Sequence, residues 1–80
     1  MRMLDGEKQV PLQTLQLYLT ERAAREFVEL LELLLTNPES NSHEHLFSDG
    51  REISFSIITP SKLADLSKYS AAEQKMMNEK

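Results

Sequence analysis

The chain has 80 residues, no cysteine and a net charge of −4 at pH 7. This length accommodates one domain, so residues 1–80 are expected to form a single unit. The lack of cysteine excludes disulfides and thiolate metal sites and fits a cytoplasmic location. The acidic balance argues against a nucleic-acid binder. No apolar run approaches the ~20 residues of a bilayer span, so we expect no membrane insertion. No apolar stretch of the kind found in signal peptides follows Arg2, so we expect no signal peptide.

The first ten residues contain one turn signal, Asp5-Gly6, between two short stretches that each include apolar residues. These stretches lack a clean alternating pattern. Residues 1–10 are therefore expected either to fray or to form a small hairpin.

A period of two in hydrophobicity follows, because three leucines alternate with Gln16 and Tyr18. This pattern predicts a strand over Leu12–Leu19. Thr20 then supplies a hydroxyl that can cap a helix N-terminus. A long amphipathic helix is predicted over 21–36, with an apolar side made of Ala24, Phe27, Val28, Leu31, Leu34 and Leu35.

The opposite side of the predicted helix is charged and mostly acidic. Two pairs at i,i+4 spacing, Arg22–Glu26 and Arg25–Glu29, are expected to support it. This side is either a solvated surface or a docking surface for a basic partner. Leu33 projects among these polar residues, and is either a partner contact or covered by the N-terminal segment.

Two alternating stretches, His43–Phe47 and 52–59, flank Asp49-Gly50, which is a strong hairpin signal. A loop of two or four residues places Phe47 opposite Glu52, whereas a three-residue loop would turn one strand over. In the first register Leu46, Ile53, Phe55 and Ile57 share one face. The other face then carries His43, His45, Phe47, Glu52, Ser54 and Ser56.

The last part of the chain carries two helix signals. Pro60 suits the first position of a helix, and Ser70 and Glu73 match a capping box. We expect either two short helices, over 60–68 and 71–79, or one bent helix. Residues 69–80 are expected to be mobile unless they dock, and their pair Met76 and Met77 either contacts a partner or packs back on the domain.

Together these elements predict an α+β fold in the order strand, helix, hairpin, helix. The expected architecture is a small three-stranded antiparallel sheet with the long amphipathic helix packed on one face. The other face of the sheet would stay open to solvent. We consider that face the candidate partner-binding surface, made of Tyr18, His43, His45, Phe47 and Glu52.

His43 and His45 lie two residues apart, so a strand would project both from the same face, where they could share a metal ion with Glu52 or Asp49. A bare H-x-H pair lacks a third ligand at characteristic spacing, and exposed imidazoles are the plainer interpretation. The chain has no Gly-rich phosphate loop, no cysteine nucleophile and no nucleophile elbow. We therefore expect neither catalysis nor a cofactor.

The sequence favours a non-catalytic protein-interaction module that forms a homodimer and binds a further, unidentified protein. Small bacterial immunity, antitoxin and inhibitor proteins provide the analogy. The alternative is a metal- or small-ligand-binding domain that uses His43 and His45. Neither hypothesis involves nucleic acid or a membrane.

Overall fold

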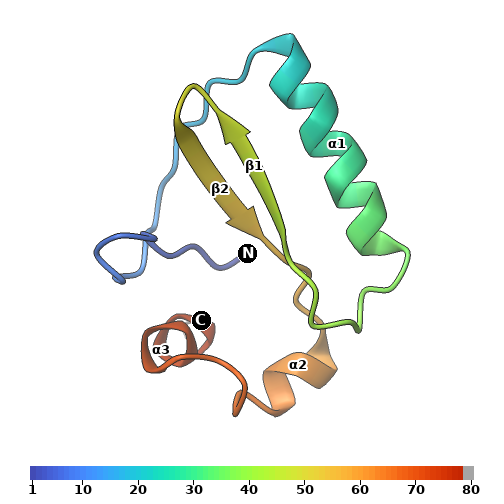
Figure 1. Ribbon diagram of the computed structural model, residues 1–80. Helices are drawn as coiled ribbons and strands as arrows, with labels where there is room; N and C mark the ends of the chain where they lie inside the picture. The colour runs from blue at the N-terminus through green and yellow to red at the C-terminus, as the bar shows by residue number, and fades with distance from the viewer. Residues whose placement is uncertain (79–80) are drawn as a thin grey trace.

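The computed structural model describes residues 1–78 and has an α+β fold. Among these residues, three helices accompany one two-stranded antiparallel sheet (Figure 1). The prediction of a three-stranded sheet is therefore wrong. No helix among the described residues is both long and apolar enough to cross a membrane. In chain order the elements are α1 Glu21–Leu35, β1 Glu44–Ser48, β2 Arg51–Phe55, α2 Pro60–Ala64 and α3 Ala71–Met77.

Helix α1 begins where the sequence indicates, because the Thr20 hydroxyl accepts a hydrogen bond from the Ala23 N–H at 3.1 Å. It packs against β1, and Phe27 reaches β2, where its ring lies 4.8 Å from that of Phe55. The apolar side is only partly covered: Ala23 and Leu34 are buried, but Val28 and Leu35 are exposed. The predicted packing of a long amphipathic helix on one face of a sheet is thus not confirmed.

The hairpin has the register that the sequence predicts. Phe47 pairs with Glu52, Leu46 with Ile53 and His45 with Ser54. The loop has two residues, Asp49 and Gly50, both with positive φ, the combination that matches strand twist in a type I′ turn. The predicted pair of His43 with Ser56 lies beyond the ladder, which ends at the pair Glu44–Phe55.

Strand β2 stops at Phe55, four residues before the predicted end at Thr59. The chain beyond it is fixed by other groups: the Lys62 ammonium donates to the carbonyl of Ile57 at 2.7 Å, and the Thr59 hydroxyl donates to Glu39 and accepts from the Lys62 N–H. The chain therefore leaves the hairpin to start α2, with Pro60 in its first turn as predicted.

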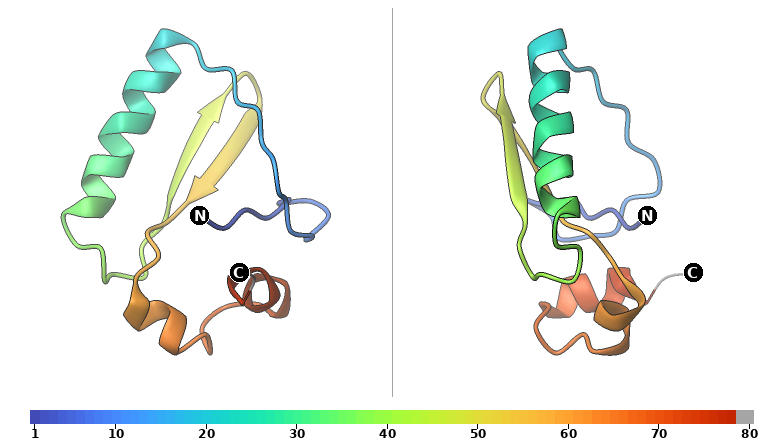
Figure 2. Two further views of the ribbon diagram at one scale, coloured as in Figure 1. Left: turned by 180° about the vertical axis from the view of Figure 1, so that it is seen from behind. Right: turned by 90° about the vertical axis from the view of Figure 1, so that its right-hand side faces the viewer.

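The strand predicted over Leu12–Leu19 is not formed. Within the described chain, no backbone group of residues 13–19 makes a hydrogen bond. The segment runs extended and stands off the plane of the hairpin (Figure 2). Its start is fixed by a bridge between Leu4 and Pro11, and its end by the N-cap of α1. An alternating pattern specifies an extended chain with one apolar face, but a strand also needs a neighbouring edge.

The C-terminal part forms two helices rather than one bent helix. Helix α2 ends at Ala64, short of the predicted Lys68, because Asp65 is extended and its carboxylate accepts from the Ser67 N–H. The predicted capping box is present at α3: Ser70 and Glu73 exchange side-chain-to-backbone hydrogen bonds. The predicted continuation of α3 to Glu79 lies outside the described residues.

Helix α3 lies beside the start of the chain, where Arg2 donates to the carbonyl of Met77 (Figure 1). Met76 and Met77 are both buried, so they pack back on the domain. Leu33 is 58% exposed, so the N-terminal segment does not cover it. The fully buried centre of the described chain is small: Leu46, on β1, is its one large side chain that is almost inaccessible.

Candidate functional site

Three rings follow one another along the exposed face of β1 and the residue before it. His43 meets His45 edge to face with ring centroids 4.9 Å apart, and His45 stacks on Phe47 at 6.0 Å with 20° between the planes. We call His43, His45 and Phe47 the aromatic row. The row exists because successive side chains of a strand alternate between faces, while Leu46 points to the core.

His45 is held in place by two side chains of β2. Its Nδ1 lies 2.8 Å from Glu52 Oε2 and 2.9 Å from the Ser54 hydroxyl. An ionised carboxylate only accepts hydrogen bonds, so the short contact to Glu52 places a proton on Nδ1. In the neutral form of the ring, Nε2 then carries the lone pair and can act as an acceptor or a ligand. Glu52 and Ser54 thus fix the orientation of the ring, and the contact to Glu52 fixes the proton on Nδ1.

The structure brings four of the five candidate residues together on one face of the hairpin. His43, His45, Phe47 and Glu52 form this group. Tyr18 does not belong to it, because its segment is outside the sheet and its side chain points to solvent, 87% exposed. The prediction that Tyr18 shares a sheet face with the histidines is therefore wrong, for the same reason that the third strand is missing.

The metal hypothesis gains no third protein ligand from the fold. Across residues 1–78 no group of three or more His, Cys, Asp or Glu side chains is arranged to hold a metal ion. Glu52 contacts His45 at Nδ1, the ring nitrogen opposite the one that could bind a metal. A carboxylate in this position orients a histidine ligand but does not itself bind the metal. Asp49, the other candidate carboxylate, lies in the hairpin turn, where its positive φ forms part of the type I′ geometry. The chain's own contribution to a metal site would be the two imidazoles.

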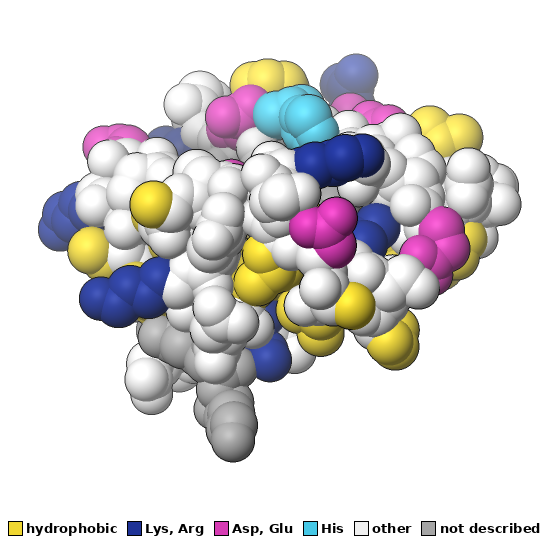
Figure 3. Space-filling model, turned by 90° about the horizontal axis from the view of Figure 1, so that it is seen from below, with side chains coloured by type: hydrophobic (Ala, Val, Ile, Leu, Met, Phe, Trp, Pro, Cys, Tyr) yellow, Lys and Arg dark blue, Asp and Glu magenta, His cyan; other side chains and the backbone are white. Residues whose placement is uncertain are grey.

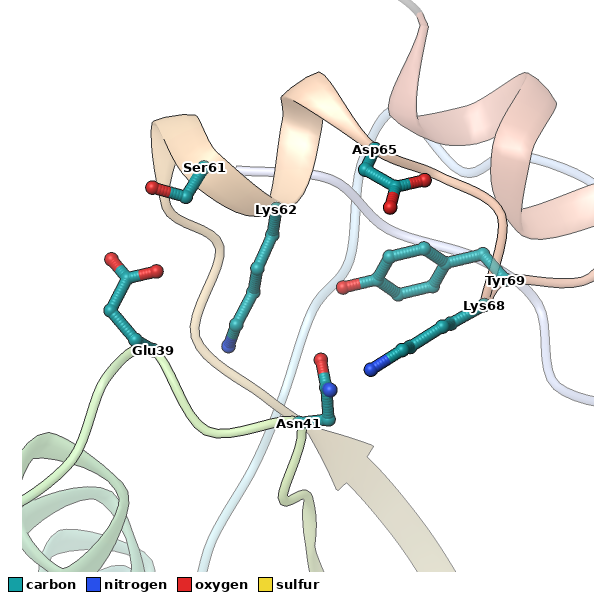
Figure 4. A pocket seen from close by; sticks show the side chains of 7 residues that line it. All are labelled: Glu39, Asn41, Ser61, Lys62, Asp65, Lys68 and Tyr69. Atoms are coloured by element: carbon teal, nitrogen blue, oxygen red, sulfur yellow. The ribbon is translucent and has the colours of Figure 1, made fainter.

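A small hollow lies between α2, its following turn and the loop that precedes β1. It has a volume of about 180 Å³, below the ~300 Å³ at which small-molecule pockets begin. Figure 4 shows Lys62, Lys68 and the Tyr69 hydroxyl directed toward its interior. Lys62 is buried, but its ammonium already donates a hydrogen bond to the Ile57 carbonyl. The lining residues are Glu39, Asn41, Ser61, Lys62, Asp65, Lys68 and Tyr69.

The sequence did not indicate this hollow. A lysine two residues after Pro60 is typical of a solvated helix start, and no spacing rule relates it to the carbonyl of Ile57. The burial of Lys62 follows from the path of the chain after β2, which brings the carbonyl under the first turn of α2. Such a contact depends on tertiary structure and leaves no local signal.

Charged groups do not concentrate into one field on the face of the molecule that carries α2 and α3. Figure 3, viewed from the end of the molecule that carries α2 and α3, shows acidic, basic and apolar side chains interspersed. On α1, Arg25 pairs with Glu21 at 2.6 Å instead of with the predicted Glu29. Both partners are exposed, so this pair adds little stability.

Comparison of the chain with protein-family models, with curated proteins and with solved structures found no match.

Proposed function

We propose that this chain is a non-catalytic protein-interaction module that binds another protein through the aromatic row of its hairpin. The observation that carries the proposal is the surface that the chain leaves uncovered. Its accessible surface is 6461 Å², whereas a folded monomer of 9.2 kDa exposes about 4,900 Å². The excess of roughly 1,500 Å² exceeds the ~800 Å² that each partner buries in a standard interface.

The shape of the chain agrees with this surface excess. The radius of gyration is 13.3 Å, against about 11.6 Å for a compact domain of the same length. Large apolar side chains remain exposed on several elements, including Val28 and Leu35 on α1 and Phe47 on β1. Uncovered apolar area of this kind is typical of chains that complete their burial on a partner.

The aromatic row supplies the anchor that such an interface needs. Phe47 is 67% exposed at the end of the row, and aromatic side chains dominate binding hot spots. Its neighbour His45 is already fixed by Glu52 and Ser54, so binding orders few new rotamers there. An exposed, preorganised aromatic row along a strand suits a protein surface better than a small molecule.

The proposal includes three further points that the sequence suggests. The chain forms a homodimer and acts in the cytoplasm. It binds its partner in the manner of small bacterial immunity, antitoxin or inhibitor proteins, which serve here as an analogy. The acidic balance of the whole chain, with a net charge of −4, favours a basic partner weakly, because the charges are dispersed.

The test is a comparison of capture by three forms of the immobilised chain. We expect wild type to retain a specific protein from an extract of cells that express the chain. The double variant His45→Ser/Phe47→Ser should lose it, and Leu33→Ser, which removes an apolar side chain 58% exposed on α1 against 67% for Phe47, should keep it. Equal capture by the hairpin variant and the control, or no specific capture at all, would contradict the proposal.

A second candidate is metal binding by His43 and His45, because the Glu52 contact leaves Nε2 of His45 available beside the second imidazole. Titration calorimetry with zinc tests it on wild type and on the His43→Ala/His45→Ala variant. Binding that disappears in the variant supports this function. Equal heats for both proteins rule it out.

A further inference from the structure

We propose that residues 15–19 of the extended segment 13–19 pair as an antiparallel β-strand with the same residues of a second copy, around a two-fold axis at Leu17. This inference deepens the homodimer of the proposed function and rests on it. The segment is extended, and within the described chain none of its backbone N–H or C=O groups makes a hydrogen bond. An exposed row of unpaired backbone groups is a template for adding a strand.

The side chains of the segment suit burial on one face only. Leu15 and Leu17 are 53% and 44% exposed, so the monomer covers about half of each. Natural proteins protect such a strand with charges, prolines or a bulge. Residues 12–19 contain neither a charged residue nor a proline. The chain therefore presents an unprotected edge with a half-covered leucine face.

A second copy fits this edge because of charge. The whole chain carries −4, so two copies repel each other over most of their surfaces. Residues 9–20, between Lys8 and Glu21, form the longest uncharged stretch in the sequence. Contact between two copies along this stretch places no like charges opposite each other, and a two-fold arrangement is the usual way for a chain to pair with itself.

The register follows from the alternation. An axis at Leu17 places Leu17 opposite its own copy, Leu15 opposite Leu19, and Gln16 opposite Tyr18. Every leucine then meets a leucine on one face, while the amide and the phenol meet on the other. Apolar pairs directly opposite each other are the unit of stabilisation in an antiparallel ladder. An axis at Gln16 would instead leave Leu19 opposite Gln13.

Sedimentation and light scattering over a range of concentrations test the pairing in the full chain. We expect wild type to be a dimer. Alternate residues donate to a partner strand, so either Gln16→Pro or Leu17→Pro must remove a ladder bond, and symmetry doubles the loss. That variant should raise the dimer dissociation constant at least about thirtyfold over its alanine counterpart, Gln16→Ala or Leu17→Ala.

Single cysteines report the register, since the described chain has no cysteine. Opposed residues of an antiparallel pair lie about 4.5–5.5 Å apart at Cα, within disulfide range. Leu17→Cys should therefore oxidise to a covalent dimer, whereas Gln16→Cys and the surface control Leu33→Cys should not. Preferential cross-linking of Gln16→Cys would overturn the register.

The remaining outcomes separate this inference from the proposed function. A wild-type monomer at all concentrations, or a dimer that both proline variants retain, overturns the strand pairing. A dimer lost in His45→Ser/Phe47→Ser but kept in the proline variants assigns self-association to the hairpin instead. Capture of a partner protein through the aromatic row is measured separately and does not depend on any of these results.

Discussion

Two stretches of this chain alternate apolar and polar residues, and only one of them forms a strand in a sheet. In the hairpin, Leu46 is 1% exposed and its neighbours pair across a two-residue turn. In the segment 13–19, the leucines stay half exposed and the backbone makes no hydrogen bond among the described residues. The same local pattern thus leads to two different states of burial and pairing.

The difference lies in what each stretch has beside it. Asp49 and Gly50 place β1 and β2 next to each other with a fixed register, so each strand supplies the other's partner. The segment 13–19 has α1 directly after it in sequence, and a helix cannot pair with a strand edge. A period of two therefore specifies conformation and facing, while pairing depends on a neighbour that the chain must bring alongside.

The largest expected effect comes from making the same substitution in both regions. Leu46→Ala should lower the free energy of unfolding by about 3–5 kcal/mol, because it opens a cavity at the centre of the core. An 80-residue domain has about 4–12 kcal/mol in total, so this variant should be largely unfolded at moderate temperature. Leu17→Ala should cost about 1 kcal/mol or less in the monomer.

Urea denaturation followed by circular dichroism measures both values, at low protein concentration so that self-association does not contribute. Equal losses for Leu46→Ala and Leu17→Ala would show that the segment is as much a part of the core as the hairpin.

The turn of the hairpin and the turn that precedes the segment 13–19 provide the next test. Gly50 has φ +72°, so Gly50→Ala should destabilise the hairpin by about 1–2 kcal/mol even though the added methyl group meets open space. Gly6 also has open space but no positive φ, so Gly6→Ala should be neutral or slightly stabilising. Thermal melts of the two variants check the contrast, and a destabilised Gly6→Ala would contradict it.

The features that the sequence predicted correctly are those set by local chemistry. The N-cap at Thr20, the capping box at Ser70 and the hairpin register each depend on residues within a few positions of one another. The outer face of the hairpin followed from the register, which brought His43, His45, Phe47 and Glu52 together as expected.

The features that the sequence did not predict depend on where distant segments meet. The segment that carries Tyr18 stays out of the sheet, and beyond the end of β2 at Phe55 the Ile57 carbonyl accepts a hydrogen bond from the Lys62 ammonium. The sequence also does not determine whether Arg25 pairs with Glu21 or with Glu29, because both lie four residues away on an exposed helix face.

The junction between the segment 13–19 and α1 should respond more weakly than either core or turn. Thr20 ends the extended segment and caps α1 through its hydroxyl. Thr20→Ala should therefore lower the free energy of unfolding by about 1 kcal/mol, whereas Thr20→Ser keeps the hydroxyl and should cost little. If both variants lose the same stability in urea, the hydroxyl bond is not what starts the helix.

The smallest expected effect concerns the loop that precedes the segment. The backbone N–H groups of Lys8 and Glu7 donate to the Asp5 carboxylate and lower its pKa below the ordinary 3.8. A lowered pKa in the folded loop means that the carboxylate stabilises the loop above the ordinary pKa, and that this contribution is lost as pH falls through the lowered value. The loop should therefore persist at pH 4 and open only in stronger acid. An NMR titration of the Lys8 and Glu7 amides reports this directly. Asp5→Asn keeps an acceptor without the charge, so its amide shifts should not change over the same range. An Asp5 carboxyl that titrates at or above 3.8 would mean that the loop is already open in solution, and that the start of the segment is free to move.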